Sequence, residues 1–566
     1  MKKTRWFLRT SGFRAARRFA VLALWVGFFC ATAQGFSFDP VTNTWRAVES
    51  VAPTRPDVWD DGGAGVRASW TFGPNVRVHP ADGAQHVWPN LVSLPDGKLY
   101  AAWMDDRTGT YKIYGAVSTD RGLTWQADQR IDDAAPAAMS RFVSLAVLGD
   151  GRIGAVWEDV RTGGWNWNVF FSRGVWNPGL GAFVWSSSIR VNTTGGSTSA
   201  GDYMHPSLAA DRFGRISAAW TDWRDGVFYQ IYFRSSTDGG TTWGNEVRIS
   251  DQIGYQPVAG DPSLAVDMFD NSDPPALLCT WNDWRGNVGG GRYPEVYFAR
   301  STDGGVSWTI PNVRVNDITD YYQQVAMRVV TATLSGVLAI GWFNDDFSGP
   351  SEMRVSRSTN DGMTWSASTA LSEPVTGGGV PVNLTGGIGN DLLASWMGYA
   401  GDWNVYFRAS GDAGVGWGSV VRVDDDATGA ATYNPIIIAL PDGNPMVALQ
   451  DTRPGLAAYN IWVAPGIRDP ALVEPAAGST AGSLWIAPNP ARGAAVLRWM
   501  VPATDPAHLR IVDITGRIML DEPAPAAGDM IWRPGARGSA PAAAGIYYVL
   551  LAGQSGTLRT RLTLLP

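Results

Sequence analysis

Histidine and tyrosine side chains gather in segments that differ between otherwise similar parts of this 566-residue chain. Aromatic and imidazole groups suit stacking on sugar rings or on aromatic ligands, and they are also ordinary residues of loop interfaces. The sequence leaves both interpretations open. The residues predicted to bind a ligand are His86, Tyr203, His205, Tyr255, Tyr321, Tyr322 and Tyr433.

Three further residues are candidates for catalysis. Arg141 and Arg328 precede predicted strands at positions that do not repeat, and a guanidinium can hold a carboxylate through two parallel hydrogen bonds. Glu158 is a carboxylate that could activate a tyrosine, which would pair a nucleophile with its base. No acid, base and nucleophile stand out together, so the sequence leaves the catalytic set unknown.

A second group of arginines follows an aspartate by two residues in a repeated pattern. A catalytic residue should be singular, so these pairs are predicted to be salt bridges that brace loops. They contain Arg107, Arg161, Arg224, Arg285 and Arg453.

No group of His or Cys residues has the spacing of a zinc site, so neither a metal site nor a cofactor is predicted. Residues 316–320 and 424–426 are rich enough in oxygen to hold a structural calcium ion, but their spacing is not that of an EF-hand, and solvated turns are favoured. Cys279 lies in an apolar stretch and is predicted to be a buried, unpaired thiol.

An internal repeat organises the chain around these residues. Five units carry an octapeptide: STDRGLTW, STDGGTTW, STDGGVSW, STNDGMTW and SGDAGVGW. Alternation and turn residues divide each unit into four strands, at 206–210, 216–220, 230–234 and 243–249 in the third unit. Small sheets of this kind bury their faces by radial stacking, so the predicted fold class is all-β, a β-propeller. The repeat is also marked by Trp103, Trp157, Trp220, Trp281, Trp342 and Trp396.

The number of units predicts how the ring closes. The first three strands occur seven times, but the seventh unit lacks a fourth strand. The segment from Trp70 to Val78 has the pattern of a fourth strand with no unit before it. We therefore predict that it completes the last blade and closes a seven-bladed propeller over residues 69–466. Residues 34–68 are predicted to be an extension packed on the rim.

The octapeptides resemble the Asp-box of bacterial sialidases and related propellers. The resemblance implies that the face opposite these hairpins binds substrate, and that a sialidase would add three arginines, a Tyr–Glu pair and an acid–base Asp. The Phe-Arg-Ile-Pro motif of that family is absent. The octapeptides themselves are predicted to fold the hairpin, with the acceptor side chain bonding backbone N–H groups and the Trp packing across its own blade. These acceptors are Asp120, Asp238, Asp303, Asn360 and Asp412.

The two ends of the chain predict export. Residues 1–33 combine seven basic residues with a short apolar run and read as a secretory signal peptide; its removal takes the formal charge from −7 to −14. That balance disfavours nucleic acid and anionic membranes as partners. Residues 467–482 read as a linker, and 483–566 as a small immunoglobulin-like sandwich. Its segments PNP, VDITGR, AAGIYYVLL and TRLTLL resemble the sorting domains of type IX secretion cargo.

These observations predict a monomeric protein, secreted or held on the outer surface of a Gram-negative-type bacterium, that binds a glycan or glycoprotein through the loops between blades. The type IX machinery is its predicted export partner, and the mature protein has no membrane span. One alternative is an exo-acting glycoside hydrolase of the exo-α-sialidase type. A second is a non-enzymatic platform for protein interaction, because a propeller does not by itself determine function.

Overall fold

The structure is a computed structural model. It describes strands at 35–39 and 44–48, most of residues 70–468, and strand segments between 483 and 565. The longest gaps between residues 70 and 468 are 194–203, 252–258, 286–293 and 373–381. Every regular element of the described residues is a β-strand, so this part of the chain holds no helix that could cross a membrane. The chain divides into two compact units at Leu472 and Val473.

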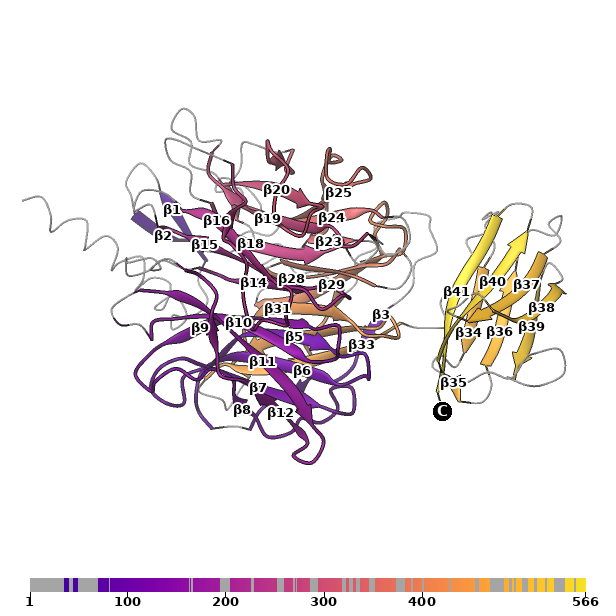
Figure 1. Cartoon of the computed structure of the whole chain (residues 1–566), viewed down its shortest axis with the longest axis horizontal. Coiled ribbons are helices and arrows are strands. Elements are labelled where there is room, and N and C mark those ends of the chain that lie inside the picture. The colour runs from indigo at the N-terminus through magenta and orange to yellow at the C-terminus, as the bar shows by residue number, and fades with distance from the viewer. Residues whose placement is uncertain are drawn as a thin grey trace, which may run out of the picture. The chain divides into compact units, whose positions relative to one another are not determined.

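Seven antiparallel sheets make up the described part of residues 70–468 (Figure 1). We number them in chain order by their first strands. Sheet one holds β5 (His86–Ser93), β6 (Leu99–Asp105), β7 (Lys112–Ser118) and β8 (Gln129–Arg130). Sheet two holds β9 (Ser140–Val147), β10 (Ile153–Asp159), β11 (Asn168–Asn177), β12 (Ala182–Trp185) and β13 (Ile189–Arg190). Sheet three holds β14 (Ser207–Ala210), β15 (Ile216–Asp222), β16 (Gln230–Ser236) and β17 (Val247–Arg248).

Sheet four holds β18 (Ala259–Val266), β19 (Leu277–Asp283), β20 (Glu295–Ser301) and β21 (Val313–Arg314). Sheet five holds β22 (Tyr322–Gln324), β23 (Val329–Thr331), β24 (Leu338–Asp345), β25 (Glu352–Ser358) and β26 (Thr369–Ala370). Sheet six holds β27 (Val382–Gly386), β28 (Leu392–Tyr399), β29 (Trp403–Ser410) and β30 (Val421–Arg422). Sheet seven holds β31 (Thr432–Ala439), β32 (Pro445–Asp451), β33 (Asn460–Arg468), β3 (Trp70–Phe72) and β4 (Val76–Arg77).

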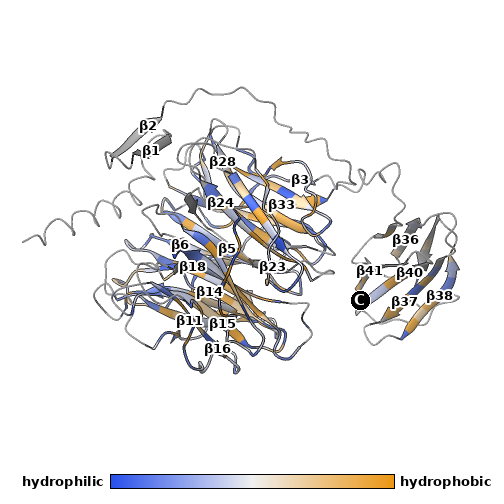
Figure 2. Ribbon diagram, turned by 90° about the horizontal axis from the view of Figure 1, so that it is seen from above, coloured by the Kyte–Doolittle hydropathy of each residue, from blue (hydrophilic) through white to orange (hydrophobic). Residues whose placement is uncertain are grey.

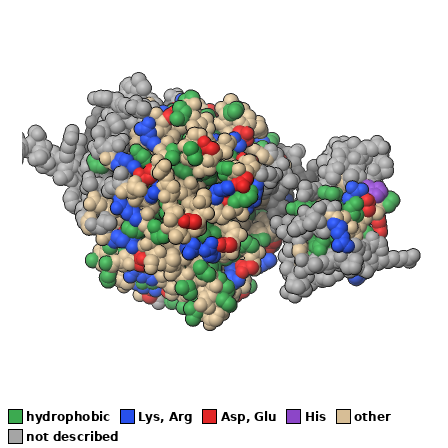
Figure 3. Space-filling view, viewed as in Figure 1, with side chains coloured by type: hydrophobic (Ala, Val, Ile, Leu, Met, Phe, Trp, Pro, Cys, Tyr) green, Lys and Arg blue, Asp and Glu red, His purple; other side chains and the backbone are tan. Residues whose placement is uncertain are grey.

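The sheets follow one another radially, which is the arrangement of a β-propeller. The first strands of neighbouring sheets contact one another, β23 makes the contacts of sheet five with β18 and β27, and β31 contacts β5. The second strands are buried, and Figure 2 shows strongly apolar segments on strands throughout this unit. Charged side chains of both signs are interspersed on the face seen in Figure 3. The tryptophans that mark the repeat form the core; Trp103, Trp157, Trp220, Trp281 and Trp342 are 0% exposed.

The predicted strands of the third unit agree with the structure except at the outer edge. The first three correspond to β14, β15 and β16 within two residues. The fourth, predicted at 243–249, is reduced to Val247–Arg248. An edge strand has a pairing partner on one side only, so it keeps its ladder only where β16 runs alongside.

A polar residue fastens the fourth strand in every sheet. It lies two positions after the strand's last residue and accepts a hydrogen bond from a backbone N–H of the third strand, at 2.7 to 3.1 Å. These bonds satisfy N–H groups that the short fourth strand leaves unpaired. The seven acceptors are Asp132, Asn192, Ser250, Asn316, Ser372, Asp424 and His79.

Strands β3 and β4, which precede sheet one in the sequence, lie in sheet seven beside β33, the last strand of this unit. Trp70 of β3 is the register partner of Arg468, and Arg77 of β4 is the partner of Trp462. His79 then takes the acceptor position, because its Nε2 lies 3.0 Å from the Ile461 backbone N. We call β3, β4 and His79, with the residues of β33 that they contact, the closing joint.

The octapeptide hairpins are hydrogen-bonded as predicted, and their tryptophans make a further contact with the preceding sheet. In the fourth unit the Asp303 carboxylate accepts from the Ser301 hydroxyl at 2.7 Å and from the Ser307 backbone N–H at 2.9 Å. Trp308 shares a core cluster with residues of its own sheet, and it also meets Phe233 of the preceding sheet edge to face at 5.2 Å, a contact that was not predicted. Trp243 with Phe171 and Trp365 with Phe298 repeat this contact.

A glycine of the same hairpin makes room for that contact. Gly305 has φ +91°, and a Cβ there would lie 2.0 Å from the Phe233 ring. Gly240 and Gly362 stand in the same relation to Phe171 and Phe298. The hairpin therefore joins neighbouring sheets, because one phenylalanine fills the space between its glycine and its tryptophan.

The second unit, at residues 473–566, has its own apolar core. The three-stranded sheet consists of β34 (Ser483–Ala487), β36 (Ala495–Met500) and β39 (Ala527–Trp532). The five-stranded sheet consists of β35 (Ala491–Arg492), β41 (Gly556–Leu565), β40 (Gly545–Gly553), β37 (Ala507–Asp513) and β38 (Ile518–Ala524). Leu497 and Trp532 of one sheet share a core with Ile511 and Val549 of the other. Near the N-terminus, β1 (Gly35–Asp39) and β2 (Thr44–Val48) pair with each other.

Candidate functional site

Five first strands have a residue in the left-handed backbone region within two positions of their first residue. Their φ angles run from +38° to +56°, and four of the five residues precede a proline. The ladder shifts register at this point in β5, β18 and β31, so the residue bulges out of the strand. Such bulges redirect side chains and occur next to active sites. We call these residues the mouth ring: Trp88, Phe142, His205, Asp261 and Asn434.

Side chains of the mouth ring touch one another from sheet to sheet. The Trp88 ring meets the Phe142 ring edge to face at 5.4 Å, and Phe142 meets the His205 imidazole at 4.3 Å. The His205 Nδ1 is paired with the Asp261 carboxylate. This continuous row spans sheets one to four, and its members are all half-buried. The row offers two aromatic faces followed by an ion pair.

The His205–Asp261 pair keeps its charges in partial contact with water. The side chains are 31% and 44% exposed. Desolvation opposes the imidazolium, but the charge and hydrogen bond of Asp261 outweigh it and raise the pKa of His205 above its ordinary value. Desolvation also opposes the carboxylate, yet His205 lowers the pKa of Asp261. Each group therefore favours the charged form of the other.

Arg141 and Glu158 lie next to this row and bind each other. The Arg141 Nε is hydrogen-bonded to Glu158 Oε1, and Glu158 Oε2 accepts from the Met204 backbone N–H at 2.5 Å. The Arg141 guanidinium also lies 3.4 Å from the centre of the buried Trp167 ring. Both residues were predicted to act separately, Arg141 on a ligand carboxylate and Glu158 on a tyrosine. The structure instead makes them one buried pair that supports the start of β9.

Tyr433 belongs to an aromatic wall on sheets six and seven. Its ring lies 5.8 Å from Tyr459 and 6.4 Å from Trp403. Burial raises the pKa of Tyr433, so its phenol stays protonated and can donate a hydrogen bond. Trp88 and Phe142 pack against the same apolar cluster as Tyr433. The structure thus brings the predicted residues His205 and Tyr433 to one region.

The other predicted ligand residues fall into two groups. Tyr203, Tyr255, Tyr321 and the catalytic candidate Arg328 lie outside the described residues, and Tyr322 is placed only as a member of β22. His86 is described, and its side chain is 0% exposed. It stacks on His79 at 3.5 Å, so it serves the closing joint instead of meeting a ligand from solvent.

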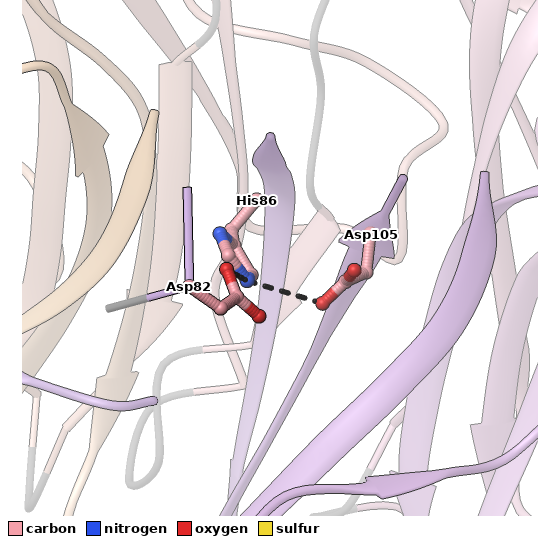
Figure 4. A group of neighbouring side chains, drawn as sticks. All are labelled: Asp82, His86 and Asp105. Carbon is pink, nitrogen blue, oxygen red and sulfur yellow. Dashed lines mark ion pairs between the residues drawn. The ribbon is translucent and has the colours of Figure 1, made fainter. Parts of the chain in front are cut away.

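Among the described residues, Asp82, His86 and Asp105 form a group whose atoms could hold a metal ion (Figure 4). His86 Nε2 lies 3.1 Å from Asp105 Oδ2 and 3.4 Å from Asp82 Oδ1. The Arg107 guanidinium already fills the cation's place, because its Nη2 lies 2.5 Å from the same Asp105 oxygen and its Nε 3.4 Å from Asp82. The donor set therefore fits the arginine better than a metal ion.

The oxygens of the two calcium candidates are engaged by protein donors. Asp317 accepts from the Ser368 backbone N–H at 2.9 Å and from its hydroxyl at 2.6 Å. Asp424 accepts from the Val405 N–H at 2.7 Å. These carboxylates hold strands together, and residues 318–320 lie outside the described part.

The repeated Asp-x-Arg pairs brace loops, which confirms that prediction. Asp283 accepts from the Trp281 indole at 3.0 Å and from the backbone N–H of Arg285 at 2.9 Å. The guanidinium reaches a second carboxylate, Asp251, at 2.5 Å and lies 4.1 Å from the centre of the Tyr297 ring. The same arrangement recurs around Arg107, Arg161, Arg224 and Arg453.

Four members of the mouth ring were missed as ligand residues. A usable signal existed, because Trp88, Asp261 and Asn434 each precede a proline at the start of a first strand, as His205 does. The residue before proline avoids the right-handed helical region. Phe142 precedes Val143 and carries no such mark.

No family model matches the chain, and no curated protein matches it. Similar solved structures include an alpha-L-arabinanase of Penicillium chrysogenum, at 13% identity and TM-score 0.44, which aligns over 70% of this chain and 98% of that one. The NanB sialidase of Streptococcus pneumoniae aligns at 11% identity and TM-score 0.39, over 70% of each chain. An ulvan lyase of family PL25 aligns at 13% identity and TM-score 0.48, over 69% of this chain and 95% of that one. At these values the similarities do not identify acting side chains.

Proposed function

We propose that the mouth ring binds a glycan. The observation that carries this proposal is the continuous row Trp88–Phe142–His205–Asp261, in which half-buried aromatic rings lead into a charged pair. A sugar presents an apolar ring face and a rim of hydroxyl groups, so it needs an aromatic surface with donors and acceptors beside it. The repeated residues build the sheets, and the variable ones supply that surface.

Binding is favoured over turnover by the state of the charged groups. A carboxylate clamp needs guanidinium donors facing the ligand, whereas the Arg141 guanidinium is engaged by Glu158 and covered by Trp167. The phenol of Tyr433 is protonated and lies among aromatic rings. Hydrolysis of the exo-α-sialidase type therefore stays the alternative, and a protein-interaction platform the second alternative.

The proposal extends to the architecture and the destination of the chain. We propose that seven blades, the last completed by β3 and β4, form the propeller, and that residues 483–566 form an immunoglobulin-like sorting domain. The pairing of β3 and β4 with β33 favours the first statement, and the shared core of the two C-terminal sheets favours the second. Removal of residues 1–33 and type IX export would then deliver a monomer to the cell surface or the medium.

A glycan array tests the proposed function, with Trp88→Gly as the main variant. Glycine accepts the positive φ of this position, so the variant removes the ring with little backbone strain. Loss of one stacking face is expected to weaken binding about tenfold. Leu180→Ser, at an exposed turn between β11 and β12, is the matched control and should bind normally.

Three results would contradict the proposal in different ways. If Trp88→Gly bound glycans as tightly as the wild type, the mouth ring would not be the binding surface. An empty array together with capture of a defined protein would favour the interaction platform. Turnover of a fluorogenic sialoside that is abolished by Arg141→Ala would favour the hydrolase.

A further inference from the structure

Two amide side chains of sheet seven lie outside the row Trp88–Phe142–His205–Asp261 that carries the proposed function. Asn434, on β31, is 7% exposed and belongs to the mouth ring. Gln450, on β32, is 1% exposed and is the neighbour of Tyr433 across the ladder. Its Oε1 accepts the backbone N–H of Trp88 at 2.7 Å. Because β31 contacts β5, both amides lie where sheet seven meets sheet one.

The NH₂ group of each amide has no hydrogen-bond acceptor in the described part of the chain. Within the described part of the chain, Asn434 Nδ2 and Gln450 Nε2 are buried and have no hydrogen-bond partner. A buried donor without a partner lowers stability, so two such donors close to a candidate binding surface indicate that a ligand supplies the acceptor.

Other buried amides of this unit show the contrast. Asn192 accepts from Val169 N at 2.9 Å and donates to Asn168 Oδ1 at 3.1 Å. Asn312 donates through its Nδ2 to the carbonyls of Ile249 and Thr309. Asn192 and Asn312 therefore use both ends of their amides, whereas the donors of Asn434 and Gln450 are unpaired.

We propose that Asn434 and Gln450 form a subsite for an oxygen that only accepts hydrogen bonds, carried by the bound sugar. Two chemical sources supply such an oxygen, the carbonyl of an acylamino group and the carboxylate of a uronic acid. Trp88 is positioned to cover the apolar part of the same group, because Gln450 holds its backbone. This inference rests on the proposed glycan-binding function, and it names the chemical group of the sugar that the protein recognises.

The unpaired donors predict which sugars the subsite prefers. A sugar that brings an acceptor satisfies both amides, whereas a sugar without one buries them unpaired, and sites of this kind discriminate strongly against the ligand that lacks the group. Amides do not titrate between pH 5 and 9, so this preference is expected to be independent of pH.

The experiment compares three oligosaccharides of equal length by isothermal titration: an N-acetylglucosamine oligomer, a glucuronic acid oligomer and cellotetraose. The full chain without residues 1–33 is used, with Asn434→Gly, Gln450→Glu and the control Leu180→Ser. Asn434→Gly deletes one amide and tolerates the φ of +52°. Gln450→Glu keeps an oxygen for the Trp88 N–H and removes the donor.

The wild-type protein should prefer at least one acceptor-bearing oligomer over cellotetraose by about tenfold or more. Asn434→Gly should reduce that preference to about twofold, because the acceptor-bearing oligomer loses more affinity than cellotetraose does. For Gln450→Glu, a loss larger for the glucuronic acid oligomer, where like charges also repel, would identify the carboxylate as the source. A loss confined to the N-acetylglucosamine oligomer would identify the acylamino carbonyl.

The failures are distinguishable. A preference that survives in Asn434→Gly and Gln450→Glu, or wild-type binding that is equal for all three oligomers, overturns the subsite and leaves glycan binding intact. Absence of binding to these oligomers and to every glycan of the array overturns the proposed function and the subsite together.

Discussion

Two regions of the larger unit use histidine in opposite ways. In the closing joint, His79 and His86 are 4% and 0% exposed and stack on each other at 3.5 Å. In the mouth ring, His205 is 31% exposed and is paired with Asp261. Burial, together with the neighbouring His86, lowers the pKa of His79 to about 3. The pKa of His205 is raised, because the Asp261 carboxylate outweighs the cost of desolvation.

The difference separates architecture from recognition. His79 acts as a neutral acceptor for Ile461 N–H, with Nδ1 donating to the Pro80 carbonyl at 2.8 Å, so it does the work that Asp, Asn or Ser does in the other sheets. His205 has no counterpart among the other ring residues, which are Trp, Phe, Asp and Asn. His79 therefore occupies a structural position that recurs in every sheet, whereas His205 belongs to the row that we propose to bind a glycan.

Acidification should break the closing joint, and this is the largest expected effect. The folded pKa of His79 is about 3, below its ordinary value of 6.5, so the unfolded chain binds more protons between these values. Stability from this group is full above pH 6.5 and is lost as the pH falls, by up to about 5 kcal/mol at pH 3. Denaturant unfolding of the isolated larger unit at pH 7, 5 and 4 measures the loss.

His79→Asn is the matched variant for that experiment. An asparagine keeps an acceptor for Ile461 N–H, as Asn192 does in sheet two. It should unfold like the wild type at pH 7 and lose less stability on acidification. An identical pH dependence in both proteins would assign the acid sensitivity to other groups, such as Asp105, whose pKa is lowered by His86 and Arg107 against the cost of burial.

Gly305→Ala should damage a joint between sheets while sparing the mouth ring. The new Cβ would lie 2.0 Å from the Phe233 ring at a φ of +91°, so overpacking and backbone strain add to about 3 kcal/mol of lost stability. Thermal unfolding checks the size of the loss. Phe233→Leu in the same chain should restore part of it, whereas strictly additive losses would show that the two residues are not coupled.

His205 gives the smallest effect and the sharpest contrast with His79. Its raised pKa means that the stability of the His205–Asp261 pair is present below pH 6.5 and is lost as the pH rises through the folded pKa. The partial exposure of both side chains limits the loss to less than about 1 kcal/mol. NMR titration should show His205 changing charge above pH 6.5 and His79 remaining neutral there. Titration of both histidines at the same pH would remove the distinction between the two regions.

How far the sequence predicted the fold can be judged from particular residues. The spacing of Trp103, Trp157 and their successors indicated the sheets, because a buried tryptophan on the second strand of successive sheets recurs at a regular interval. The place of Trp70 followed from counting strands. The contact of Trp308 with the preceding sheet did not follow, because the pattern of a hairpin does not say which neighbour it meets.

The candidate site was predicted less well. His205 and Tyr433 were found from residue type, and they do lie in the region of the mouth ring. His86 was selected for the same reason and lies in the core. Residue type gives the chemistry that a side chain can perform, but its exposure depends on the strand that covers it.

The sequence alone therefore determined the repeat, the all-β character and the bracing role of the Asp-x-Arg pairs, because these depend on short-range patterns that recur along the chain. The tertiary structure decided that Arg141 and Glu158 neutralise each other, that His79 replaces an aspartate, and that Trp88, Phe142, His205 and Asp261 form one row. These are contacts between residues up to hundreds of positions apart, and their geometry is set by how neighbouring sheets pack, which no local pattern encodes.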